Sequence, residues 1–156
     1  MKKLFVLSII AFSITACGDS SSGEKKSTTS ESTKTENGNP SYDLKRGEGK
    51  FTKVDVSPTL EVAKADAGEK VFSVKCSSCH KLTEEKLVGP GWKGVTDRHT
   101  AEWIMNFATN PDAMLNKDPK AQAMLEICLV RMPNQNLSDD DARNVYEFMR
   151  KNDGVK

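Results

Sequence analysis

Three side chains that could do chemistry together stand in the segment Cys76-Ser-Ser-Cys79-His80. The two thiols are three residues apart, so from one helical turn both can reach the two vinyl groups of a single porphyrin. The imidazole follows at once and would lie beneath the iron as its proximal ligand. This spacing predicts one covalent haem c, attached through Cys76 and Cys79 and ligated by His80.

Two other interpretations of the same thiols are open. Cys76 and Cys79 could form a disulfide, or they could supply two ligands of a zinc site. Zinc would need further ligands from Cys128, His99 or His80, and that spacing matches no common zinc pattern. A redox-active Cys-x-x-Cys pair would follow a strand in a βαβ pattern, which this sequence lacks. Haem attachment is the favoured interpretation.

A sixth iron ligand is predicted at Met132, which Pro133 follows. The proline stiffens the backbone on which the thioether must be held, and a thioether ligand favours ferrous iron and raises the potential. His99 is the alternative, because bis-histidine haem also transfers electrons, at lower potential. An open site is the third interpretation. Cys128, on the inward stripe of a predicted helix, is expected to be a buried apolar residue.

The first residues have the features of an export signal. Lys2 and Lys3 precede a short apolar run, which predicts a signal peptide over residues 1–16. The ending Ile14-Thr15-Ala16-Cys17 resembles the lipobox of bacterial lipoproteins, in which the cysteine is acylated. We therefore expect lipidation at Cys17. The four cysteines then divide into one for lipid, two for haem and Cys128.

The next segments change in composition. Residues 17–42 are rich in Ser, Thr, Glu, Lys and Gly and are predicted to be a flexible, lipid-anchored linker, because they cannot bury enough apolar surface to fold. Such a coil would reach on the order of 25–30 Å. Residues 43–57 form an N-terminal extension whose order stays open. The folded domain is expected over residues 58–156.

The elements that position these residues are predicted to be helical. We expect a helix over 60–76, a loop over 81–99, a helix from Thr100 to Asn110-Pro111, a helix from Asp118 with Pro119 first, and a helix from Ser138 to 152–154. Asp141 completes a variant capping box with Ser138. The His80 ring should donate its second N–H to the Pro90 carbonyl, which would fix the ring. The fold class is all-α.

Together these residues resemble the small monohaem class I cytochromes c, in a bacterial lipoprotein form. The resemblance covers residues 60–152 and is carried by Gly68-Glu-Lys-Val-Phe72, Cys76-x-x-Cys-His80, Gly89-Pro90, Met132-Pro133 and Leu137-Ser-Asp-Asp-Asp141. It implies helices wrapped around one haem, axial ligands His80 and Met132, and the Pro90 carbonyl as partner of His80. It also implies that Gly68 and Phe72 cross the last helix near Val145 and Tyr146.

Trp92 is expected on the porphyrin edge or at a propionate, and a plain core position is its alternative. The predicted function is a membrane-tethered one-electron carrier, not an enzyme, with the haem domain on the periplasmic side. By analogy its partners are respiratory enzymes such as a terminal reductase or oxidase. The alternative is a haem sensor or peroxidase-like enzyme with an open distal site. The chain is expected to be a monomer without a nucleic-acid partner.

A locally basic stretch over residues 70–100 flanks the haem motif. It could meet an acidic redox partner, or it could be a solvated face without function. Its basic residues are Lys70, Lys75, Lys81, Lys86, Lys93 and Arg98.

Overall fold

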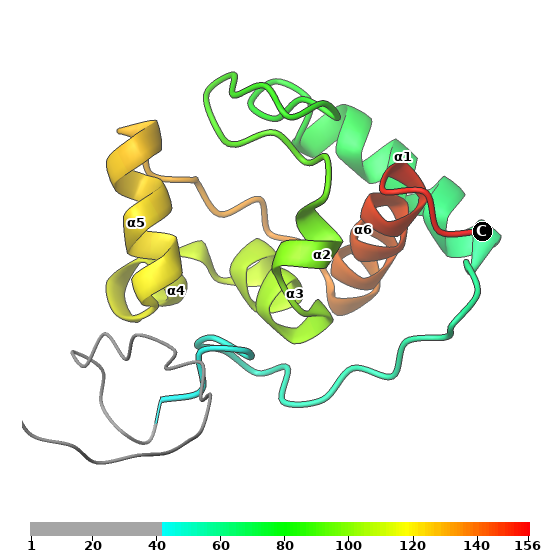
Figure 1. Ribbon diagram of the computed structural model, residues 1–156, viewed down its shortest axis with the longest axis horizontal. Helices are drawn as coiled ribbons and strands as arrows, with labels where there is room; N and C mark the ends of the chain where they lie inside the picture. Colours follow the sequence, from blue (N-terminus) through cyan, green and yellow to red (C-terminus); the bar gives the residue numbers. More distant parts are fainter. Residues whose placement is uncertain (1–41) are drawn as a thin grey trace, which may run out of the picture. The chain divides into compact units, whose positions relative to one another are not determined.

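The structure is a computed structural model and describes residues 42–156. This part of the chain consists of helices joined by loops (Figure 1). The predicted signal peptide, Cys17 and the linker up to residue 41 lie outside the described residues. The all-α prediction is confirmed. The helices are α1 (Val62–Lys75), α2 (Val95–Arg98), α3 (Ala101–Thr109), α4 (Pro111–Lys117), α5 (Pro119–Cys128) and α6 (Asp139–Asn152).

Polar side chains begin three of these helices where the sequence predicted it. The Thr100 hydroxyl accepts from the backbone N–H of Trp103 at the start of α3, and Asp118 does the same for Ala121 at the start of α5. Ser138 and Asp141 form the reciprocal capping box of α6. Each cap satisfies a backbone donor that the first helical turn leaves unpaired.

The structure adds to or shifts the predicted elements at three places. Asn110-Pro111 ends a helix as predicted, but Pro111 also begins α4, which was not predicted. Asn110 ends α3 and its side chain accepts from the N–H of Ala113, while proline is tolerated at the first helical position because its missing N–H would be unpaired there. The predicted loop over 81–99 contains the short helix α2, and the first helix begins at Val62 rather than at residue 60.

The first and last helices, α1 and α6, pack side by side (Figure 1). Gly68 is buried at their contact, where a Cβ would lie 2.0 Å from the Asn144 carbonyl oxygen and 2.9 Å from Cβ of Phe148. Phe72 continues the contact, with its ring centroid 5.4 Å from that of Phe148. The crossing is therefore made at Asn144 and Phe148, whereas the family resemblance placed it at Val145 and Tyr146.

A buried ion cluster joins α6 to the start of α1. The fully buried Glu147 carboxylate accepts from Arg143 at 2.5 Å, from Arg150 at 2.6 Å and from the backbone N–H of Glu61 at 2.8 Å. Arg150 also donates to the Ser57 carbonyl at 2.8 Å. A buried charge needs such partners, since an unpaired one would be strongly destabilising.

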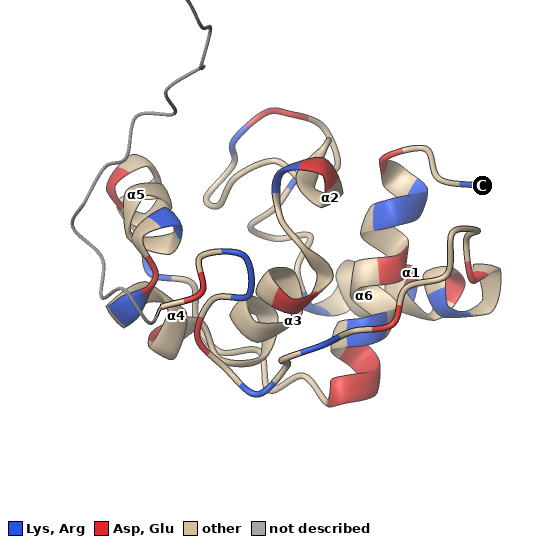
Figure 2. Cartoon of the chain, turned by 60° about the horizontal axis from the view of Figure 1, so that its bottom comes forward, with Lys and Arg blue, Asp and Glu red and all other residues tan. Residues whose placement is uncertain are grey.

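The N-terminal extension, residues 43–57, is ordered along α3. Asn106 is fully buried, and its side-chain amide accepts from the Phe51 N–H at 2.9 Å and donates to the Phe51 carbonyl at 3.0 Å. Glu102 accepts from the Val54 N–H at 2.8 Å. The extension carries both acidic and basic residues (Figure 2), so its exposed side is polar while its backbone is held by the buried amide.

Candidate functional site

The largely apolar cavity inside the helices has a volume of about 320 Å³. Of the candidate site residues that the sequence singled out, seven line it: Cys76, His80, Pro90, Trp92, His99, Cys128 and Met132. They come from the ends of α1, α2 and α5, from the loop before α2 and from the segment between α5 and α6. The cavity therefore brings together candidate ligands that are more than 50 positions apart in the chain.

His80 is held at the cavity wall by its own loop. Its Nδ1 lies 2.9 Å from the Pro90 carbonyl oxygen, which leaves Nε2 as the free ring nitrogen. Burial lowers the pKa of His80, against the opposing effect of the Pro90 carbonyl. A neutral ring that donates from Nδ1 has its other lone pair available for a metal.

The thiols of Cys76 and Cys79 occupy different environments. Cys76 follows α1 directly, is buried in the cavity wall, and burial raises its thiol pKa to about 11. Cys79 is half-buried and does not line the cavity. Both are free thiols in the structure. The zinc alternative requires at least three such ligands close together. In residues 42–156 no three His, Cys, Asp or Glu side chains lie close enough to hold a metal ion.

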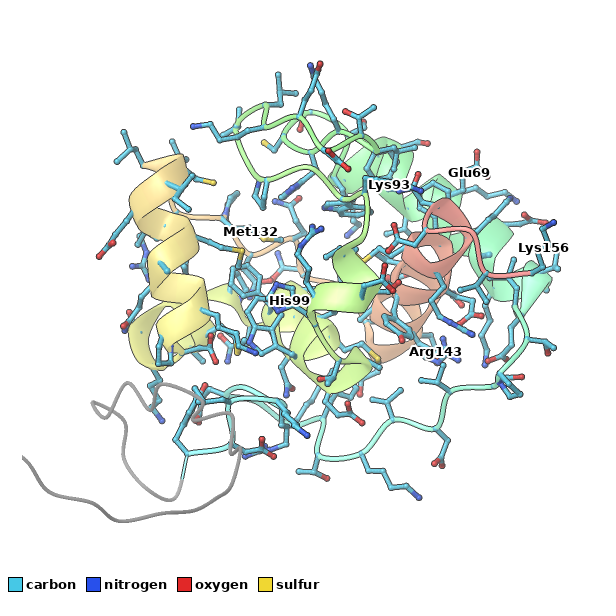
Figure 3. The ribbon with its side chains drawn as sticks, in the orientation of Figure 1. Glu69, Lys93, His99, Met132, Arg143 and Lys156 are labelled. Carbon is cyan, nitrogen blue, oxygen red and sulfur yellow. The ribbon has the colours of Figure 1, made fainter. Side chains whose placement is uncertain are left out.

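Met132 lies in the segment between α5 and α6, and Figure 3 places it in the same region as His99. Both side chains are half-buried and both line the cavity. Cys128 also lines it, but it is half-buried rather than buried as predicted, because the C-terminal end of α5 is partly open to solvent.

His99 is stacked on Trp103. The two ring centroids are 3.9 Å apart and the ring planes differ by 14°. Burial, followed by the charges of Lys120 and Arg98, lowers the pKa of His99 to about 4, so the ring is neutral near pH 7. Sequence reasoning missed the role of Trp103 at the site, because His99 has an extended backbone before the Thr100 cap and no helical spacing relates it to Trp103 in α3.

Two buried polar atoms at this cavity have no hydrogen-bond partner among the described residues. They are Nδ1 of His99 and Nε1 of Trp103. An unpaired buried polar atom is costly, so both atoms point to a missing partner, which for the indole N–H of Trp103 is an acceptor. Arg98, which also lines the cavity, adds a positive charge there. An apolar cavity with these donors fits a porphyrin with carboxylate substituents, and the wall holds the nitrogen and sulfur ligands that haem iron accepts.

A cytochrome c family match covers residues 65–153, more than half of the chain, and the chain belongs to this family. A cytochrome c from Rhodothermus marinus has a similar structure, with a TM-score of 0.65 and 30% identity over 67% of this chain and 90% of that chain. An engineered form of that protein, Rma TDE, gives a TM-score of 0.65 at 28% identity, with the same coverage.

A further relative is the "cytochrome c-type cyt cy" of Rhodobacter capsulatus. It is 42% identical over 48 residues, which are 31% of this chain and 24% of that protein. The chain therefore matches only about a quarter of this relative's length. Family membership implies a covalent haem c and electron transfer as the typical activity. Among residues 42–156, no helix is long and apolar enough to cross a membrane.

Proposed function

We propose that this chain is a membrane-tethered one-electron carrier with one covalent haem c, ligated by His80 and Met132. The observation that carries the proposal is the shared cavity, whose wall holds the free Nε2 face of His80 and the thioether of Met132. Haem iron supplies one-electron oxidation and reduction when it is bound. With both axial positions filled by protein, no position is left for a substrate.

The surrounding residues hold and shield the group. Cys76 and Cys79 would form the thioether bonds, and the Pro90 carbonyl fixes the ring of His80. Trp92 is buried against Phe72 at 4.8 Å and His80 at 5.5 Å between centroids, so it packs the proximal side. These contacts would hold His80 in place and cover the proximal side of a bound haem.

Met132 is a better sixth ligand than His99 in this arrangement. The His99 ring is stacked on Trp103, and its Nδ1 and the indole N–H of Trp103 both lack a partner among the described residues, which suits an anionic acceptor. Turning His99 toward iron would break the stack and leave the indole N–H alone. His99 and Trp103 would instead hold a haem propionate, with Arg98 contributing charge.

The anchor is part of the same proposal. Cys17 would carry lipid, residues 17–42 would be the tether, and the haem domain would work in the periplasm of a bacterium. Such a tether would join the domain at Tyr42, whose hydroxyl donates to Asp118 at the start of α5 at 3.0 Å. Partners would be respiratory redox enzymes such as a terminal reductase or oxidase, met in small transient interfaces.

Absorption spectroscopy of the purified holoprotein tests the ligands. The ferric protein should show the weak far-red sulfur-to-iron band, and Met132→Ala should abolish it while opening the iron to carbon monoxide in the ferrous state. The matched control is Met124→Ala, a half-buried methionine of α5 that lines the same cavity. If His99→Ala changes the axial ligation and Met132→Ala does not, the haem is bis-histidine. Rapid carbon monoxide binding by wild type would favour the sensor or peroxidase-like alternative.

Two further measurements test attachment and anchoring. Haem should stay with the protein in acid acetone, and Cys76→Ser with Cys79→Ser should lose it, whereas Cys128→Ser should not. Mass spectrometry should find an acylated Cys17 at the mature N-terminus, and Cys17→Ala should release the domain from membranes. Extractable haem, or an unmodified N-terminus on a soluble protein, would contradict the respective part of the proposal.

A further inference from the structure

The segment that carries Met132 is weakly fixed by its own backbone. Within the described part of the chain, residues 130–137 neither donate nor accept a main-chain to main-chain hydrogen bond. Leu129 precedes the segment with φ 61°, and Asn136 near its end has φ 49°, so left-handed residues other than glycine stand at both ends. Such conformations are costly and persist only where surrounding contacts impose them.

Side-chain contacts therefore have to hold this segment in place. Arg131 donates to Asp112 at 3.1 Å, but these side chains are 48% and 70% exposed, and an exposed ion pair contributes little. Arg131 also donates to the Asn116 side-chain oxygen at 3.2 Å, again in an exposed position. Lys75 makes a partly buried contact: its Nζ donates to the Gln135 carbonyl at 2.9 Å. A charge-assisted, partly buried bond is stronger than the exposed contacts of Arg131.

The position of Lys75 in the chain relates it to haem attachment. It is the last residue of α1 and directly precedes Cys76, so its bond joins the attachment residues to the segment that carries Met132. Among residues 42–156, Lys75 makes no salt bridge with a carboxylate that would compete for its ammonium group. The Lys75 ammonium group therefore bonds to the Gln135 carbonyl without competition from a carboxylate.

We propose that Lys75 is a positioning residue for Met132, acting by clamping the segment 130–137 through the Gln135 carbonyl. The inference rests on the proposed function, since it takes Met132 as the iron ligand. Without the clamp, the segment spends more of its time with the thioether away from the iron. An added ligand then competes with Met132 more easily, because its apparent affinity is set by the fraction of molecules with an open position.

The test is imidazole binding by the ferric holoprotein. Lys75→Met, which keeps the aliphatic stem but removes the donor, should bind imidazole roughly tenfold more tightly, the effect of losing one hydrogen bond to a charged group. Lys75→Arg retains a charged donor and should restore much of the wild-type affinity. Lys70→Met is the matched control, because Lys70 is an exposed lysine on the same helix.

A second readout follows the segment itself. Amide hydrogen exchange of residues 130–137 should speed up in Lys75→Met and stay unchanged in Lys70→Met. If Lys75→Met yields no folded holoprotein, Lys75→Gln is measured in its place. Wild-type imidazole affinity together with wild-type exchange in the Lys75 variant would overturn the inference while leaving the proposed function intact. Loss of the proposed function would be seen separately, in wild type, as a missing sulfur-to-iron band.

Discussion

The imidazole of His80 lies directly against the backbone of Gly89. A Cβ at Gly89 would be 2.3 Å from Cε1 of His80 and 2.8 Å from its Nδ1, the atom that bonds to the Pro90 carbonyl. Gly89 does not have a positive φ, so backbone conformation does not require glycine here. Glycine is needed because the His80 ring lies too close to leave room for a Cβ. The loop therefore leaves room for one orientation of the ring and fixes it from two sides.

Gly89→Ala should displace the His80 ring and weaken its bond to the Pro90 carbonyl. We expect a loss of about 1–3 kcal/mol in the free energy of unfolding of the holoprotein, the usual cost of overpacking. Denaturant unfolding followed by haem absorbance measures it. Val88→Ala, at the neighbouring exposed position, is the control. Equal stability of the two variants would mean that the loop yields without disturbing the ring.

Gly68→Ala separates two opposing effects at the contact of α1 and α6. Helix propensity alone would stabilise the protein by about 1 kcal/mol. The new Cβ would instead meet backbone atoms of Asn144, which have no room to move, so we expect a net loss of about 3 kcal/mol. Thermal or denaturant unfolding gives the sign. Lys70→Ala, on the exposed side of α1, should change stability by less than about 0.5 kcal/mol.

Asn106→Ala should release the N-terminal extension from α3. The variant loses three hydrogen bonds, to Arg46 and to both backbone groups of Phe51, and leaves those groups unpaired. A loss of about 2–4 kcal/mol follows from unpaired backbone groups of this kind. Hydrogen exchange at the Phe51 amide and limited proteolysis within residues 46–54 measure the release. Unchanged protection of that amide would show that apolar contacts suffice to hold the extension.

Acid should weaken the junction between α1 and α6 through Glu61. The Lys64 hydrogen bond, together with the charge of Arg143, lowers the pKa of Glu61 below its ordinary value of 4.5. The unfolded chain then takes up this proton more readily than the folded one, so the stabilisation is present above pH 4.5 and is lost as pH falls through the lower, folded value. Glu61→Gln should show a shallower fall of unfolding free energy in that range. Equal slopes for wild type and Glu61→Gln would contradict this prediction.

The sequence by itself determined the chemistry of the site and most of the helices. Cys76, Cys79 and His80 are adjacent in the chain, so their spacing alone predicts haem attachment, and the caps at Thr100, Asp118 and Ser138 act over three residues. Such local interactions can be inferred without knowing the fold. The helix at Pro111 was missed because the same Asn-Pro pair that ends one helix also begins the next.

Only the tertiary structure decided how distant residues meet. The stack of His99 on Trp103, the approach of Gly89 to His80 and the bond from Lys75 to the Gln135 carbonyl depend on how the loops cross the cavity. The ordered extension depends on one buried amide, Asn106, whose partners lie 55 or more positions earlier in the chain. Contacts of this kind arise from packing and from pairing of buried polar groups, which no periodicity along the chain encodes.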